Sequence, residues 1–183
     1  MIQRVLDFID RLNEKIGQGA GWLALAAILL ASYNAIVRYL GRFLERNLTS
    51  NAVLELQWYL FSLMFLLGAA YGLKHDVHVR VNVFYCRLSA RGRAWITLLG
   101  TVLFLIPFCL FMLWASWPGV RNSWAIREMS PDPDGLPRYP IKTALLAGFA
   151  LLLLQGCSQA VKTARFLRGR AQGTDEERHE HAG

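Results

Sequence analysis

Few residues of this 183-residue chain have side chains that do chemistry, and its histidines and carboxylates come first. His75, Asp76 and His78 lie close together, and two histidines three positions apart on a helix can share a metal ion. Only Asp76 is near enough to act as a third ligand, so we expect no metal site. The sequence also lacks a Ser/His/Asp arrangement, a phosphate-binding loop and a dinucleotide fingerprint, so it predicts no catalysis and no bound cofactor.

A second group of polar residues interrupts long apolar stretches: Asn34, Arg38, Glu55, Gln57 and Gln155. Ionisable groups at membrane depth are costly and usually face protein or water. Arg38 and Glu55 fall at similar depth in neighbouring stretches, which allows an ion pair between them. In the alternative, each side chain extends to the membrane surface instead. Neither lies deep, so we expect no acid that carries a proton or an ion across by itself.

These polar residues are positioned by four apolar segments, at about residues 22–39, 53–73, 95–117 and 141–161. A bilayer core requires about 20 apolar residues per helix, and lipid offers the backbone no hydrogen-bond partner. Only 18% of the chain is charged, whereas a soluble domain has about 25%. The sequence therefore predicts an all-α integral membrane protein, with a four-helix transmembrane domain at residues 19–165.

The two tails differ from this domain. In residues 1–18 the apolar residues recur at helical spacing and charged residues fill the other face. This pattern predicts an amphipathic helix in the membrane interface; a solvated helix is the alternative. Residues 166–183 are polar without periodicity, which predicts a disordered tail. Of the 20 Lys and Arg residues, 13 fall in the tails and the loop between the second and third segments. This bias predicts cytoplasmic termini and explains the net charge of +7 without nucleic acid.

Two features bear on packing within the membrane. Gly68 and Gly72 form a GxxxG pattern, and small residues one turn apart let another helix approach closely. The partner helix can belong to this chain or to another. Pro107 lies within the third segment, where it removes one helix hydrogen bond and predicts a kink.

The outer loop before the fourth segment, residues 123–137, is the least generic stretch of the sequence. Its prolines stiffen the backbone, and Asp132-Pro133-Asp134-Gly135 fits a type I turn. We expect a rigid, outward-facing loop with exposed Trp124 and Leu136, which suits docking of another protein; a simple connector is the alternative. Two aspartates are too few for a calcium site.

Several short motifs occur together in a fixed order along residues 20–165. They are Glu55–Phe61 leading into Phe65–Tyr71, then His78–Asn82, then Ser123-Trp124, Glu128–Pro131 and Gly135–Pro137, and finally Lys142 and Leu154–Gly156. In this combination the chain resembles the small permease subunit of tripartite ATP-independent periplasmic (TRAP) transporters, the DctQ family. Asn82 stands where the family pattern usually has aspartate, which puts in doubt any ionic contact at this position.

The resemblance implies a division of labour within a bacterial inner membrane. A large permease subunit moves an organic acid by an elevator motion coupled to an ion gradient, usually sodium, and a periplasmic binding protein delivers the acid. The small subunit packs on the large one and anchors its fixed part in the bilayer. We therefore expect an interface with the large subunit at Gly68, Gly72, Glu55, Gln57 and Gln155.

The resemblance also assigns loop residues. The outer loop is expected near the binding protein through Trp124, Glu128, Ser130, Pro131, Asp132, Gly135, Leu136 and Pro137. The inner loop contributes His78, Arg80 and Asn82.

Two other functions remain open at this point. A stand-alone dimeric four-helix exporter requires a membrane-buried acid, and its one candidate, Glu55, lies near the outer surface. A membrane anchor of a redox enzyme requires haem-binding histidines within the spans, and the four segments contain none.

Overall fold

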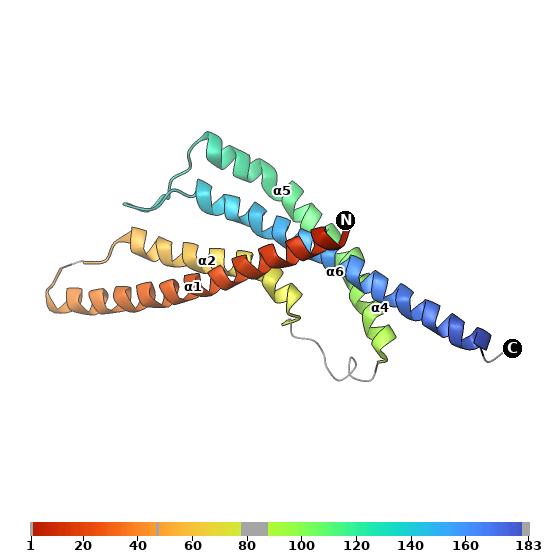
Figure 1. Cartoon of the computed structure of the whole chain (residues 1–183). Coiled ribbons are helices and arrows are strands. Elements are labelled where there is room, and N and C mark those ends of the chain that lie inside the picture. The colour runs from red at the N-terminus through yellow and green to blue at the C-terminus, as the bar shows by residue number, and fades with distance from the viewer. Residues whose placement is uncertain (1, 47, 78–87, 181–183) are drawn as a thin grey trace.

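The computed structural model describes residues 2–46, 48–77 and 88–180, with side chains described from residue 3 to residue 169. Its elements are α1 (Ile2–Phe43), α2 (Asn51–Lys74), α4 (Ala90–Gly100), the π-helical turn η1 (Thr101–Leu105), α5 (Ile106–Ala125) and α6 (Tyr139–Glu180). This part of the chain contains no β-strand (Figure 1). Four of its helical rods are long and apolar enough to cross a membrane, which confirms the predicted fold class.

The first helix has no break where the sequence predicted a separate interfacial helix. α1 runs through 42 residues, a length of about 63 Å, whereas the hydrocarbon core is about 30 Å thick. The last helix, α6, is equally long and continues to Glu180, through residues for which the sequence predicted a disordered tail. Glu and Arg are the most frequent residues of that stretch and are good helix formers, which favours continuation of the helix.

The third rod combines α4, η1 and α5. Its π-helical turn ends two residues before Pro107, and the Ile106 amide donates to the Thr101 carbonyl five residues earlier. A π-turn widens the helix locally and so accommodates a proline, which has no amide hydrogen to donate. α4 and α5 meet at an angle at this point (Figure 1), where the sequence predicted a kink.

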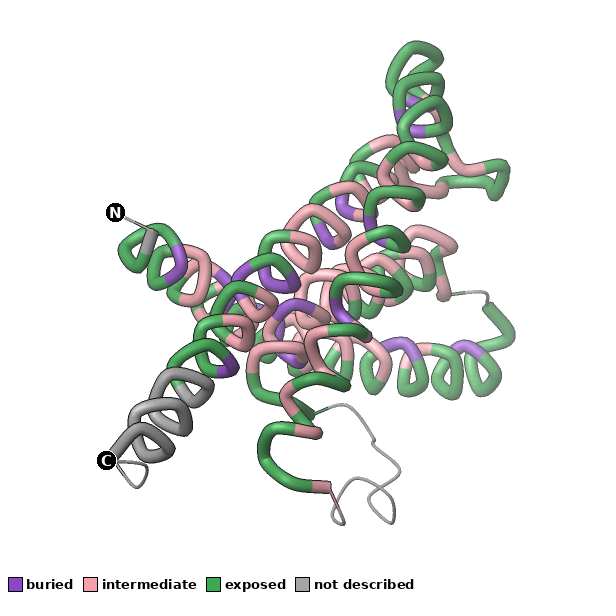
Figure 2. Tube along the Cα trace, turned by 90° about the vertical axis from the view of Figure 1, so that its right-hand side faces the viewer, coloured by how far each residue is buried: buried purple, intermediate pink, exposed green. Residues whose placement is uncertain are grey.

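The helices pack as a row rather than as a closed bundle. α2 contacts α1 on one side and α6 on the other, α5 packs on α6, and α1 meets α6 near its N-terminus (Figure 1). The molecule exposes 13226 Å², whereas a compact soluble protein of 20.7 kDa exposes about 8,900 Å². Buried positions are few and lie where the helices meet (Figure 2). Both faces of the row are therefore available to lipid or to another protein.

Two glycines of α6 lie at close contacts with neighbouring helices. A Cβ atom at Gly148 of α6 would lie 2.9 Å from the Leu66 Cβ and 3.0 Å from the Leu66 carbonyl oxygen of α2. A Cβ atom at Gly156 would lie 3.0 Å from a methyl carbon of Leu105 in η1. These two positions allow α6 to approach its neighbours on both sides.

The GxxxG pair of α2 packs within the chain. Gly72 is buried, and the nearest atom to a Cβ at Gly68 is the Ala20 Cβ of α1, at 4.0 Å. Gly68 therefore faces α1, and Gly72 is buried within the chain. Contact with the large subunit through these two glycines stays untested.

Candidate functional site

The outer loop begins with a sharp turn at the end of α5. Arg127 has a positive φ of 47°, and the Glu128 amide donates to the Ser123 carbonyl at 3.0 Å, closing the helix end. The loop then folds back on itself. The Ser130 amide donates to the Leu136 carbonyl at 3.2 Å, and the Arg138 amide donates to the Glu128 carbonyl at 2.9 Å. These bonds give the loop a defined shape without a regular secondary structure.

The tip of this loop is the hydrogen-bonded turn that the sequence predicted at residues 132–135. The Gly135 amide donates to the Asp132 carbonyl at 3.1 Å. Asp134, the third turn residue, has a φ of 57°, which is typical of type II and differs from the predicted type I. Aspartate tolerates this left-handed conformation better than most residues. Gly135 is required for another reason, since a Cβ there would overlap the Ser130 side chain.

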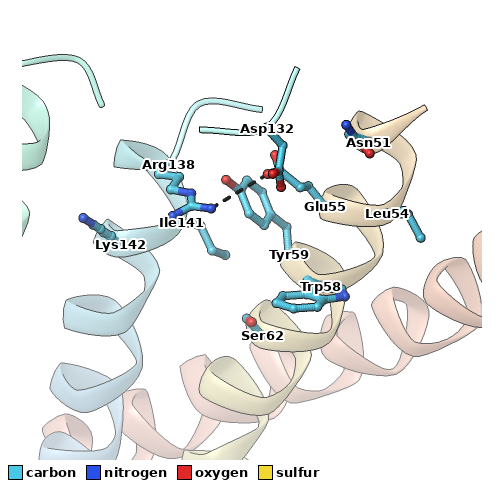
Figure 3. Close-up of a pocket in the computed structure, with 10 residues that line it drawn as sticks. All are labelled: Asn51, Leu54, Glu55, Trp58, Tyr59, Ser62, Asp132, Arg138, Ile141 and Lys142. Carbon is cyan, nitrogen blue, oxygen red and sulfur yellow. Dashed lines mark ion pairs between the residues drawn. The ribbon is translucent and has the colours of Figure 1, made fainter. Parts of the chain in front are cut away.

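One stripe of α2 holds this loop in place. Asn51, Glu55 and Tyr59 are four residues apart and share one helix face. The Asn51 amide nitrogen donates to the Pro133 carbonyl at 3.0 Å, and the Tyr59 hydroxyl donates to the Pro137 carbonyl at 3.2 Å. Figure 3 shows this face of α2 beneath the loop.

Glu55 makes the central contacts of this stripe. Its Oε2 accepts from the Leu136 amide at 2.6 Å, and its Oε1 accepts from the Ser130 hydroxyl. We call Asn51, Glu55, Tyr59 and their loop partners the outer clamp.

The ion pair of Glu55 corrects a prediction. The sequence allowed a pair with Arg38, but the carboxylate lies 4.0 Å from the Arg138 guanidinium (Figure 3). Arg138 ends the loop and lies over α2 because the clamp holds it there. Arg38 is exposed near the outer end of α1, next to Tyr39 and Arg42.

The rest of the loop is fixed to the start of α6. The Trp124 indole nitrogen donates to the Thr143 hydroxyl at 2.7 Å, and its ring packs against Tyr139 with centroids 4.7 Å apart. Trp124 remains exposed, as predicted, but Leu136 is only half-exposed because the clamp draws it toward α2.

Glu128 and Lys142 form an ion pair beside this tryptophan. The Lys142 ammonium lowers the pKa of Glu128 below its ordinary value. A lowered folded-state pKa means that the pair stabilises the loop at neutral pH, and that this contribution is lost only as the pH falls through that lowered pKa.

A cavity of about 460 Å³ lies between α2 and α6 under the loop. Ten residues line it (Figure 3): Asn51, Leu54, Glu55, Trp58, Tyr59, Ser62, Asp132, Arg138, Ile141 and Lys142. Among them Glu55 faces Arg138, Lys142 pairs with Glu128 of the loop, and the set offers no nucleophile next to a base. Within the described residues, no three His, Cys, Asp or Glu side chains come together as a metal site. The outer end is thus a loop fixed to α2 and α6 over this cavity.

A second polar cluster, which the sequence did not reveal, lies at the opposite end of the row. The Asn13 amide nitrogen donates to the Gln155 oxygen at 2.7 Å, and the Gln155 nitrogen donates to Asp10 at 3.2 Å. Asp10 also accepts from Ser158 at 3.3 Å and pairs with Lys162. Gln155 is only 3% exposed, so its partners belong to this chain and not to another subunit.

Glu14 extends this cluster to α2, where it pairs with Lys74 and His75. Asp10, Asn13 and Glu14 thus face the other helices, whereas the sequence predicted for residues 1–18 an interfacial helix or, in the alternative, a solvated one. Their spacing of three and four residues was a signal of a shared helix face. Sequence periodicity does not reveal whether such a face meets water or another helix.

The remaining predicted site residues are placed as follows. Gln57 is half-buried and lines a groove of about 430 Å³ between α1 and α2, together with Ala27 and Ile28. His78, Arg80 and Asn82 lie outside the described residues.

Comparison with known proteins assigns the family. A comparison with curated proteins gave no match. A family model described as the DctQ component of tripartite ATP-independent periplasmic transporters matches residues 22–166, which include the outer clamp and most of the four rods. This match covers most of the chain and agrees with the four helices that are long and apolar enough to span a membrane. The chain therefore belongs to the DctQ family, the small membrane component of TRAP transporters.

Proposed function

We propose that this chain packs on the large permease subunit of a TRAP transporter and anchors it in the bacterial inner membrane. The large subunit takes up an organic acid, driven by an ion gradient, and a periplasmic binding protein delivers that acid. Both termini of the small subunit lie in the cytoplasm, and its outer clamp faces the periplasm.

The placement of charge carries this proposal. No Asp, Glu, His, Lys or Arg occurs within residues 18–37, 56–73, 94–120 or 143–161. Glu55, the one acid considered for a stand-alone exporter, is engaged by the Leu136 amide and the Ser130 hydroxyl. A chain without an ionisable group at mid-membrane does not couple transport to an ion by itself. Ion coupling therefore belongs to a partner, which fits an accessory role.

The open faces of the row support anchoring. Bulky apolar side chains are exposed along α1, among them Ile28 and Ile36, and along η1 and α5, among them Phe104 and Phe111. A row of helices offers more lateral surface than a closed bundle of the same size. When one face of the row contacts the large subunit and the other contacts lipid, the small subunit enlarges the immobile part of the transporter. The moving domain of the large subunit then works against this larger immobile part.

Gentle detergent extraction of the tagged chain is expected to retain a large, many-helix permease in fixed ratio. A photo-crosslinking residue at Ile28 and Ile36, on α1 at one end of the row, or at Phe104 and Phe111, on η1 and α5 at the other end, is then expected to link to that permease from one end and not from the other. Mass spectrometry of the linked peptides identifies that end. Recovery of a homo-oligomer alone, from cells that express the neighbouring genes, would contradict the accessory role.

The second test concerns the tip of the outer loop. Asp132 is exposed, and reversing its charge with Asp132→Lys is expected to lower uptake by the assembled transporter several-fold by weakening encounter with the binding protein. Glu128 is less suitable, because its pair with Lys142 shapes the loop itself. The measurement is uptake at increasing binding-protein concentration. Unchanged uptake over the whole range means that the tip does not face the binding protein.

A further inference from the structure

Two acids in the N-terminal part of α1 form ion pairs within the chain. Asp10 pairs with Lys162 of α6, and Glu14 pairs with Lys74 of α2. These contacts fix the rotation of α1 about its axis, because one side of the helix must face α2 and α6. The opposite side is left for whatever surrounds the protein at this end.

That opposite side carries a basic stripe with apolar neighbours. Arg4, Phe8, Arg11 and Lys15 follow one another at spacings of four, three and four residues, so they share one helix face. All four are exposed, Phe8 to 65%, and the adjacent Val5 to 53%. Within the described residues, none of the three cations forms an ion pair with this chain.

The depth of the stripe follows from the pair between Asp10 and Lys162. The apolar span of α6 ends at Val161, so Lys162 and its partner mark the boundary of the hydrocarbon core. Arg4 lies six residues from Asp10, about 9 Å along the helix, and Lys15 lies five residues away, about 8 Å on the other side. Long cationic side chains reach several ångströms along the membrane normal, so all three reach the headgroup layer.

The surroundings of the stripe are positively charged. At this end the described residues 3–18, 74–77, 88–93 and 162–169 hold nine cations and four acids. The cations are Arg4, Arg11, Lys15, Lys74, Arg91, Arg93, Lys162, Arg165 and Arg168, and the acids are Asp7, Asp10, Glu14 and Asp76. The pairs of Asp10 with Lys162 and of Glu14 with Lys74 remove one cation each, and the cations of this set still exceed its acids by five. The surface next to the bilayer therefore favours negatively charged groups.

We propose that the stripe of Arg4, Phe8, Arg11 and Lys15 is a binding surface for anionic phospholipids, with the three cations on headgroup phosphates and Phe8 between them in the membrane interface. Cations that alternate with exposed apolar side chains match a charged surface above an apolar layer, which is the chemistry of a lipid interface. The inference goes beyond the subunit's role as an anchor and does not depend on the identity of the permease.

The test is native mass spectrometry of the full chain titrated with phosphatidylglycerol or with phosphatidylcholine. The triple variant Arg4→Gln, Arg11→Gln, Lys15→Gln is compared with a matched triple variant near the opposite, C-terminal end of α1. This control is Arg38→Gln, Arg42→Gln, Arg46→Gln. Loss of the inner stripe is expected to weaken phosphatidylglycerol binding by about tenfold or more, with phosphatidylcholine unchanged. The outer variant is expected to keep most of its affinity.

Equal loss in both triple variants, or no loss in the inner one, overturns the proposal. Unchanged lipid binding with reduced permease co-purification also overturns it, because the stripe then meets an acidic protein surface. The variant Arg4→Lys, Arg11→Lys keeps the charge and is expected to bind phosphatidylglycerol normally. A single Arg11→Gln variant, expected to lose part of the affinity, covers the case in which the triple variant does not fold.

Discussion

Replacement of Glu55 by alanine is expected to release the outer loop, with amide exchange at Leu136 faster by about tenfold or more. The Leu136 amide and the Ser130 hydroxyl both donate to this carboxylate, and Arg138 lies 4.0 Å from it. Alanine removes all three contacts at once and leaves Asn51 and Tyr59 as the remaining hydrogen bonds from α2 to the loop. Hydrogen–deuterium exchange of the purified chain measures this directly.

Two variants separate the clamp from a general loss of structure. Glu55→Gln keeps one acceptor but loses the charge facing Arg138, so an intermediate exchange rate is expected. Gln57→Ala alters the same turn of α2 but faces the groove toward α1, so loop exchange is expected to stay at its original rate. If exchange at Leu136 is the same in Glu55→Ala as in the original chain, the clamp does not order the loop. If the loop opens and uptake by the complex is nonetheless normal, the loop is not a docking surface.

The second large effect is expected from Gly148→Leu, which should separate α2 from α6. A Cβ at this position lies 3.0 Å from the Leu66 carbonyl oxygen, and backbone cannot move aside as a flexible side chain does. Overpacking of this kind costs about 1–3 kcal/mol of stability. Leucine adds further atoms beyond the Cβ, so we expect a cost near the upper end of that range. Thermal unfolding of the detergent-solubilised chain is expected to shift to lower temperature by several degrees.

Gly21→Leu is the matched control, since a Cβ there has no neighbour within 4 Å and the position is exposed on α1. It is expected to leave the unfolding temperature nearly unchanged. Equal stability of the two variants would mean that α2 and α6 are not held as closely as the structure places them.

The predicted spans and the observed rods agree because the bilayer imposes a local rule. About 20 apolar residues must follow one another for a helix to cross, and that rule is visible in any window of the sequence. The helices extend beyond the predicted spans for a reason outside that rule. In α1 the chain is already helical before the apolar stretch begins, and in α6 it remains helical after the apolar stretch ends. Polar contacts such as Asp10 with Lys162 hold these two extensions together.

The outer loop was partly predictable for a similar reason. Pro133 and Gly135 restrict the backbone locally, so a turn at residues 132–135 was readable from the sequence. The identity of the clamp was not, because Glu55 lies 75 residues from Ser130 and 81 from Leu136. Arg38 and Arg138 were both chemically suitable partners for this carboxylate. Only the path of the loop over α2 selects Arg138.

The sequence by itself determined the membrane class, the four spans, the absence of charge at mid-membrane and the family likeness, since each of these depends on residues close together in the chain. The tertiary structure alone decided which way polar faces turn. Asp10 and Glu14 face α6 and α2, and Gly148 meets Leu66 of α2 closely while Gly68 of the GxxxG pair faces α1. The physical reason is that helix rotation and crossing are set by contacts between distant segments, which no local pattern specifies.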